Sequence, residues 1–109
     1  MDGSVWVYNV LNTEIKMSFF GHSEQVTVGK FTPDGKYLIT GSEDTSLKIW
    51  DLKNQQLLHT VKGKKYHQAT ITALDISQSR GIIASGSIKN ELCFVNLANA
   101  TVRITFFII

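Results

Sequence analysis

The sequence predicts an all-β fold of short antiparallel strands, and three observations support this prediction. Apolar and polar residues alternate in short runs between Val26 and Trp50, and a period of two is typical of strands rather than helices. The turn-forming run Thr32-Pro33-Asp34-Gly35 separates the first two runs, because Pro fixes φ and Gly tolerates a positive φ. The pattern then recurs on both sides of this segment, which indicates a repeat.

The central copy of the repeat spans Gly21 to Asp51. The pair Gly21-His22 opens it, the pair Trp50-Asp51 closes it, and a further strand is expected at 57–61. This arrangement resembles the WD40 repeat family, in which four antiparallel strands, a to d, form one blade of a β-propeller. The resemblance covers nearly the whole chain.

Self-alignment divides the chain into three segments. Residues 1–20 are expected to form the second half of a blade (strands c and d), 21–63 a complete WD40 repeat and 64–109 a degenerate repeat. The predicted fold is therefore a WD40 β-propeller fragment of about two and a half four-stranded blades. A ring needs about four blades or more, so we expect the remainder of a longer propeller to complete it.

The strongest candidate set of functional side chains is His22, Thr40, Asp44 and Trp50. The resemblance implies that they form a structural tetrad, a hydrogen-bonded chain that satisfies buried polar groups. A His, a hydroxyl and an Asp are also typical of hydrolases, but catalysis would need an oxyanion site and an open pocket as well. The sequence indicates neither, so we expect no catalytic residue and no enzyme activity.

The third segment retains only part of this set. A shift of 45 residues aligns His67 with His22 and Ser85 with Thr40, but Lys89 and Val95 stand where Asp and Trp are expected. We therefore predict that no tetrad forms in this blade.

Composition limits the other classes of function. The three histidines, His22, His59 and His67, lie far apart with no Cys or carboxylate at ligand spacing, so we expect no metal and no cofactor. A single Cys93 allows no internal disulfide and fits a reducing compartment. With no long apolar run, we expect a cytoplasmic protein, with a nuclear location also open, and no membrane contact. The formal net charge of +2 is too small to indicate nucleic-acid binding.

The predicted function is a non-catalytic scaffold that binds other proteins. The loops that join strand d to strand a, and strand b to strand c, share one rim of a propeller. Candidate partner contacts on that rim are Ser23, Glu24, Glu43, Lys64, Lys65, Tyr66 and Gln68. Two alternatives remain open: an RNA-binding propeller fragment that uses the basic loop 62–68, with Tyr66 as a stacking aromatic, and a truncated fragment without independent function.

Short motifs also point to one group within the family. The ordered series Pro33-Asp34-Gly35-Lys36, Ile49-Trp50-Asp51-Leu52-Lys53 and Gly86-Ser87 looks like the group that contains angio-associated migratory cell protein. That group includes a fungal chaperone of a newly made large-subunit ribosomal protein. The resemblance implies a ribosomal protein as a partner, held on an acidic propeller face, and a role in ribosome assembly.

Overall fold

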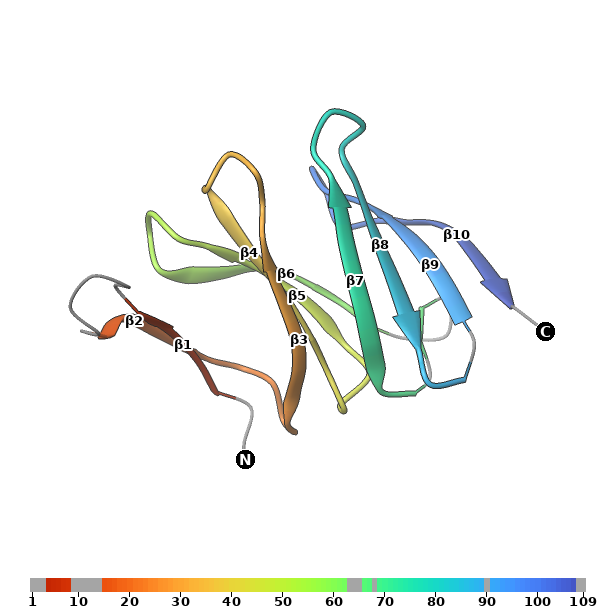
Figure 1. The fold of residues 1–109 in the computed structure, drawn as a ribbon, viewed down its shortest axis with the longest axis horizontal. Helices are drawn as coiled ribbons and strands as arrows, with labels where there is room; N and C mark the ends of the chain where they lie inside the picture. The colour runs from red at the N-terminus through yellow and green to blue at the C-terminus, as the bar shows by residue number, and fades with distance from the viewer. Residues whose placement is uncertain (1–3, 9–14, 63–65, 68, 90, 108–109) are drawn as a thin grey trace.

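The computed structural model describes residues 4–8, 15–62, 66–67, 69–89 and 91–107. Within these residues the chain forms three antiparallel sheets, which stand side by side in Figure 1. The first sheet pairs β1 (Ser4–Tyr8) with β2 (Ile15–Phe20). The second holds β3 (Val26–Phe31), β4 (Tyr37–Ser42), β5 (Leu47–Asp51) and β6 (Gln56–Val61) in that order, and the third holds β7 (Ile71–Ser77), β8 (Ile82–Ser87), β9 (Glu91–Asn96) and β10 (Val102–Phe107). We call these sheets blades 1, 2 and 3.

This arrangement confirms the predicted fold class. A sheet of two strands is followed by two sheets of four, as expected for about two and a half antiparallel blades of a propeller. No helix in the described part of the chain is long and apolar enough to cross a membrane.

The turn at 32–36 joins β3 to β4 by the chemistry that the sequence predicts. The N–H of Gly35 donates to the carbonyl of Thr32 at 2.9 Å, and Gly35 adopts a φ of 74°. The Thr32 hydroxyl donates to Asp34 Oδ1 at 2.6 Å, and the Lys36 N–H donates to the same atom. The Asp side chain therefore fixes the turn from inside, as is typical of this residue.

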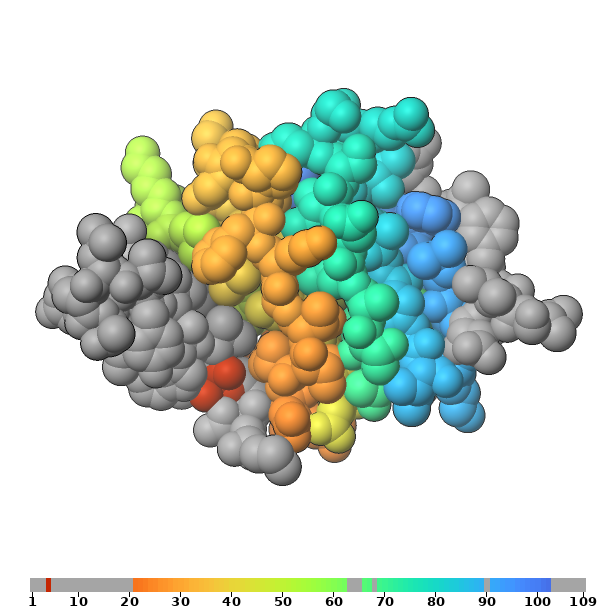
Figure 2. Space-filling view, viewed as in Figure 1, coloured from red at the N-terminus to blue at the C-terminus, as the bar shows by residue number. Residues whose placement is uncertain are grey.

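The core lies between blades 2 and 3. Blade 2 contributes Ile39, Leu47, Ile49 and Val61, and blade 3 contributes Ile71, Leu74, Ile83, Cys93 and Val95, together with Tyr66 from the loop between the blades. Figure 2 shows the surfaces of β3 and β7, the inner strands of the two blades, in contact. Burial of this shared apolar surface is the main force that holds one blade on the next.

Gly41 sets the distance between the two blades. A methyl group at this position of β4 would lie 2.6 Å from Cγ2 of Ile71 in β7, closer than packed carbon atoms approach. Polar contacts reinforce the same interface: the Thr27 hydroxyl donates to the carbonyl of Ile71, and Lys30 pairs with Asp75 at 3.2 Å. The close contact therefore depends on the absence of a side chain at Gly41.

The two ends of the blades differ in the turns that they carry. The turn at 43–46, the turn that begins at Ile88 and the loop that leads into His22 lie at one end, which we call the tetrad rim. The turns at 32–36, 52–55, 78–81 and 97–101 lie at the other end, which we call the opposite rim. Hydrogen bonds between Asp34 and Gln78 join two of these turns.

Candidate functional site

The structure brings His22, Thr40, Asp44 and Trp50 together at the tetrad rim of blade 2. The Trp50 indole N–H donates to Thr40 Oγ1 at 2.8 Å, and Thr40 Oγ1 lies 2.7 Å from Nε2 of His22. Nδ1 of the same imidazole lies 3.0 Å from Asp44 Oδ2. These bonds form one continuous chain. It runs from Trp50 on strand c to Thr40 on strand b, then to His22 in the loop that leads into the blade (the entry loop), and ends at Asp44 in the b–c turn.

The direction of each bond follows from the donors available. Because the indole nitrogen can only donate, Thr40 accepts from it and donates its own proton to Nε2 of His22. Nδ1 then carries the imidazole proton and donates to Asp44, a tautomer assigned from the network. Burial lowers the pKa of His22, and the contact with Asp44 only partly offsets this, so the imidazole is neutral at pH 7.

Asp44 is held as a carboxylate by several donors. Burial alone would raise its pKa, but hydrogen bonds from the side chain and backbone of Ser46 and from His22 outweigh burial and lower the pKa to about 2. The Ser46 hydroxyl lies 2.5 Å from Oδ1, and the backbone N–H of Ser23 donates to Oδ2 at 3.0 Å. The carboxylate thus ties the entry loop to the b–c turn.

The geometry of this set is that of a closed structural network. The Thr40 side chain is fully buried, and its hydroxyl oxygen is bonded on both sides, so no substrate atom can reach it. Gly21 packs against the other end of the set, since a methyl group there would lie 2.9 Å from Cη2 of Trp50. The hydrolase alternative needs an accessible hydroxyl, and this geometry does not provide one.

Blade 3 has no Asp or Trp at the tetrad positions, as its sequence predicts, but different residues build a related network there. The Tyr66 hydroxyl lies 2.6 Å from Ser85 Oγ, and Ser85 Oγ lies 3.0 Å from Nε2 of His67. On the other side of the ring, Nδ1 lies 3.6 Å from Glu91 Oε1, and Ser87 donates to that carboxylate at 3.0 Å. Tyr66 thus takes the place of the Trp50 indole, and Glu91 lies on the side of the imidazole where Asp44 lies in blade 2, but beyond hydrogen-bond distance.

The imidazole of blade 3 carries its proton on the other nitrogen. Nε2 of His67 lies 3.0 Å from the backbone carbonyl oxygen of Ser85, which can only accept, so Nε2 is the donor. Burial lowers the pKa of His67, although the Ser85 carbonyl and Glu91 oppose this effect. Burial also raises the pKa of the Tyr66 phenol far above its usual range, so the hydroxyl stays protonated.

Alignment at a fixed shift could have revealed Tyr66 but not Glu91. Tyr66 precedes His67 directly, in the place that Gly21 holds before His22, so the same alignment pairs a large side chain with a glycine. Glu91 aligns with Ser46, which is itself hydrogen-bonded to the carboxylate of blade 2. The acid has therefore moved from the b–c turn to the start of strand c, and only the structure shows that it lies near the imidazole.

Comparison with known proteins identifies the family. Residues 13–51 match the family model described as WD domain, G-beta repeat. The chain is 36% identical over 100 residues to human angio-associated migratory cell protein, in an alignment that covers 92% of this chain and 22% of that protein. The chain carries a WD40 repeat. The predicted resemblance to the angio-associated migratory cell protein group is confirmed by this alignment.

Two further comparisons support the WD40 assignment. The crystal structure of RRP9 WD40 repeats superposes with a TM-score of 0.87 and 24% identity, covering 97% of this chain and 33% of that chain, which shows the shared fold. Pre-rRNA-processing protein IPI3 of Mycosarcoma maydis is 31% identical over 94 residues, which covers 72% of this chain and 16% of that protein. The chain thus spans about a fifth of the curated relatives that it matches.

The WD40 tetrad rim carries some, but not all, of the predicted partner contacts. Ser23, Glu24 and Glu43 are exposed there. Tyr66 is a correction: it is only 2% exposed and is bonded to Ser85, so it offers neither a rim contact nor a stacking surface for RNA. The other three candidates, Lys64, Lys65 and Gln68, lie outside the described residues.

An apolar side chain on this rim was missed in the sequence. Ile88 follows Ser87 in the b–c turn of blade 3, at the position that Glu43 holds in blade 2, and it is 62% exposed. A hydrophobic residue at that position is a contact candidate, which the self-alignment could have singled out.

The described residues contain no group of three metal-ligating side chains. His22 and His67 are committed to their separate networks, and His59 lies on β6, the outer strand of blade 2. Cys93 is fully buried beside His67, with Sγ 3.8 Å from Nδ1.

Proposed function

We propose that this chain is part of a non-catalytic WD40 scaffold that binds another protein at its tetrad rim. The observation that carries the proposal is that buried and exposed polar residues lie next to each other at that rim. The polar atoms of the tetrad are buried and bonded to one another, whereas Glu24, Glu43 and Ile88 are exposed on turns of the same rim. A rigid network that presents exposed turn residues suits recognition rather than turnover.

We further propose that the partner is a basic segment of a component of ribosome assembly. Glu24 and Glu43 give the rim of blade 2 an acidic character, which would attract such a segment. Exposed Lys89 lies at the rim of blade 3, so the segment would bind over blade 2, with Ile88 at its margin. Lys62, which directly follows β6 of blade 2, would border the segment on the other side. The similarity to a pre-rRNA-processing protein and to angio-associated migratory cell protein supports this assignment.

Site-specific photo-crosslinking in cells tests both parts of the proposal. A photoreactive amino acid at Glu43 should cross-link to a ribosomal protein or a ribosome-assembly factor. The same amino acid at Lys53, which is also exposed but lies on the opposite rim, serves as the matched control and should not give that product.

Two results would contradict the proposal in different ways. A cross-link at Glu43 that disappears after ribonuclease treatment would support the RNA-binding alternative instead. A stable protein cross-link without any ribosome-assembly component would retain the scaffold but overturn the proposed partner. Charge reversal by Glu24→Lys, combined with the photoreactive amino acid at Glu43, should reduce the expected product, because the rim would lose its attraction for a basic segment.

A further inference from the structure

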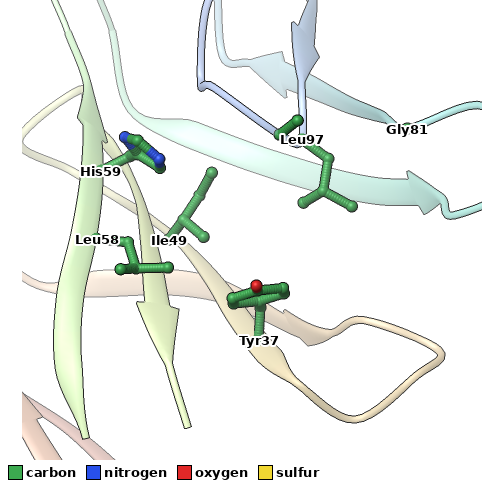
Figure 3. A pocket seen from close by; sticks show the side chains of 7 residues that line it. Tyr37, Ile49, Leu58, His59, Gly81 and Leu97 are labelled. Carbon is green, nitrogen blue, oxygen red and sulfur yellow. The ribbon is translucent and has the colours of Figure 1, made fainter. Parts of the chain in front are cut away.

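A second surface, distinct from the tetrad rim, lies in a crevice between blades 2 and 3 near the opposite rim. The crevice has a volume of about 280 Å³. Its lining in Figure 3 comes from both blades: Tyr37, Ile49, Leu58, His59, Gly81 and Leu97. Blade 2 contributes side chains from three neighbouring strands, and blade 3 closes the crevice with two of its turns.

A β-bulge brings two consecutive residues of β6 to this crevice. In the pairing of β5 with β6, Trp50 faces Leu57 and Ile49 faces His59, so Leu58 is left over. Consecutive residues of a regular strand point to opposite faces, and a bulge re-aims one of them. Leu58 and His59 therefore both line the crevice, while Leu57 does not.

The lining fits an aliphatic side chain beside a peptide backbone. Ile49, Leu58 and Leu97 supply apolar surface, and Leu58 remains 39% exposed. The Tyr37 hydroxyl and the His59 imidazole make no hydrogen bond with another described residue, so both can bind an incoming polar group. The volume is at the small end for small-molecule sites, about 300 to 1,000 Å³, but holds one or two side chains.

The charges around the crevice favour an acidic occupant. Exposed Lys36 and Arg80 are the chain neighbours of the lining residues Tyr37 and Gly81. Asp51, which pairs with Tyr37 across the sheet, already accepts hydrogen bonds from Asn54 and from the backbone of residues 53 and 54. Asp34 on the same rim is likewise hydrogen-bonded already, to Thr32 and Gln78. Neither Lys36 nor Arg80 forms an ion pair with a described carboxylate, so an acidic segment would complement these two cations.

We propose that this crevice binds a short extended segment of a partner protein, which inserts one aliphatic side chain and carries Asp or Glu on either side of it. The inference rests on the proposed scaffold function and adds a second surface with the opposite charge preference. The aliphatic side chain would pack on Leu58 and Ile49, while Tyr37 and His59 bind the peptide backbone and Arg80 pairs with an acidic residue.

Selection from a phage-displayed library of random heptapeptides tests this inference on the whole chain. We expect enrichment of peptides with a Leu, Ile or Val next to Asp or Glu. Leu58→Asp should weaken the binding of a selected peptide by about tenfold or more, since about 1.4 kcal/mol corresponds to tenfold. Leu57→Asp is the matched control: Leu57 is equally exposed and adjacent but does not line the crevice, so binding should be retained.

Arg80→Glu gives an independent readout, because it changes charge without altering the apolar lining. It should weaken the binding of the selected acidic peptides through the change of charge alone. Failure to enrich any peptide, a basic consensus, or equal losses with Leu57→Asp and Leu58→Asp would overturn the inference. The Glu43 cross-link separates the two proposals. If the cross-link persists in the Leu58→Asp variant but the peptide selection fails, only the crevice proposal is rejected.

Discussion

The Tyr66 hydroxyl is expected to stabilise blade 3, and Tyr66→Phe removes it with almost no change in shape. The phenol is 2% exposed and its oxygen lies 2.6 Å from Ser85 Oγ, so the lost contact is a short, fully buried hydrogen bond. Ser85 keeps its contact with His67 at 3.0 Å, so no buried donor or acceptor is left entirely without a partner. The free energy of unfolding should therefore fall by about 1 to 2 kcal/mol rather than by more.

Urea unfolding followed by circular dichroism measures this difference. The midpoint should fall while the slope stays constant, because the substitution does not change the surface exposed on unfolding. In a thermal melt, a loss of 1 kcal/mol corresponds to roughly 4 to 8 °C for a domain of this size.

Tyr37→Phe is the matched control for the same chemical change. Tyr37 is half-buried, and its hydroxyl has no hydrogen-bond partner among the described residues, so its loss should cost less than about 0.5 kcal/mol. Equal stabilities for the two variants, or a wild-type melt for Tyr66→Phe, would refute the assignment of Tyr66 to the polar network of blade 3.

The remaining predictions concern packing, backbone strain and pH. Gly41→Ala should lower the free energy of unfolding by about 1 to 3 kcal/mol through overpacking, whereas Gly86→Ala, at the equivalent position of blade 3, meets its nearest side-chain atom at 3.5 Å and should be tolerated in a melt of the 109-residue chain. Thr45, a β-branched residue with a φ of 72°, should give way to Asn with a gain of about 1 kcal/mol, visible as a higher urea midpoint; an unchanged midpoint would mean that the turn is not strained. His22 has a lowered pKa in the folded chain, so the unfolded chain binds its proton first and stability should fall as the pH drops below about 6.5, a slope that His22→Asn should reduce. The stabilisation from Asp44, whose pKa is lowered to about 2, should be complete above pH 4 and be lost as the pH falls towards 2, which acid titration of the urea midpoint would show.

Local signals in the sequence were sufficient for the fold and for blade 2. The period-two runs, the turn at 32–35 and the paired Gly-His and Trp-Asp motifs are all short-range features, and strand order within an antiparallel blade follows directly from chain order. The contacts of Trp50 with Thr40 and of His22 with Asp44 followed from the resemblance, since the spacing within one blade fixes which side chains meet.

The features that could not be predicted depend on contacts across strands or between blades. Nothing in the alternation of β6 indicates the bulge at Leu58, because the extra residue is defined only by its partner strand. The role of Gly41 is similar: the sequence shows only a glycine in a strand, and the structure shows that Ile71 of the next blade packs against it. In both cases a tertiary contact determines the role of the residue, and the sequence pattern of a single strand does not reveal that contact.

The two networks show why the loss of a motif residue does not imply the loss of its structure. In blade 2 the large aromatic ring comes from Trp50 on strand c, and the entry loop has Gly21, whose missing side chain makes room for the indole. In blade 3 the ring comes from Tyr66 on the entry loop, and strand c has the smaller Val95, which is fully buried. Compared with blade 2, the large side chain that donates the hydrogen bond has moved from strand c to the entry loop, and the Ser85 hydroxyl still has its hydrogen-bond partners. What the fold requires is a buried donor beside that hydroxyl, and either of two backbone positions can supply it.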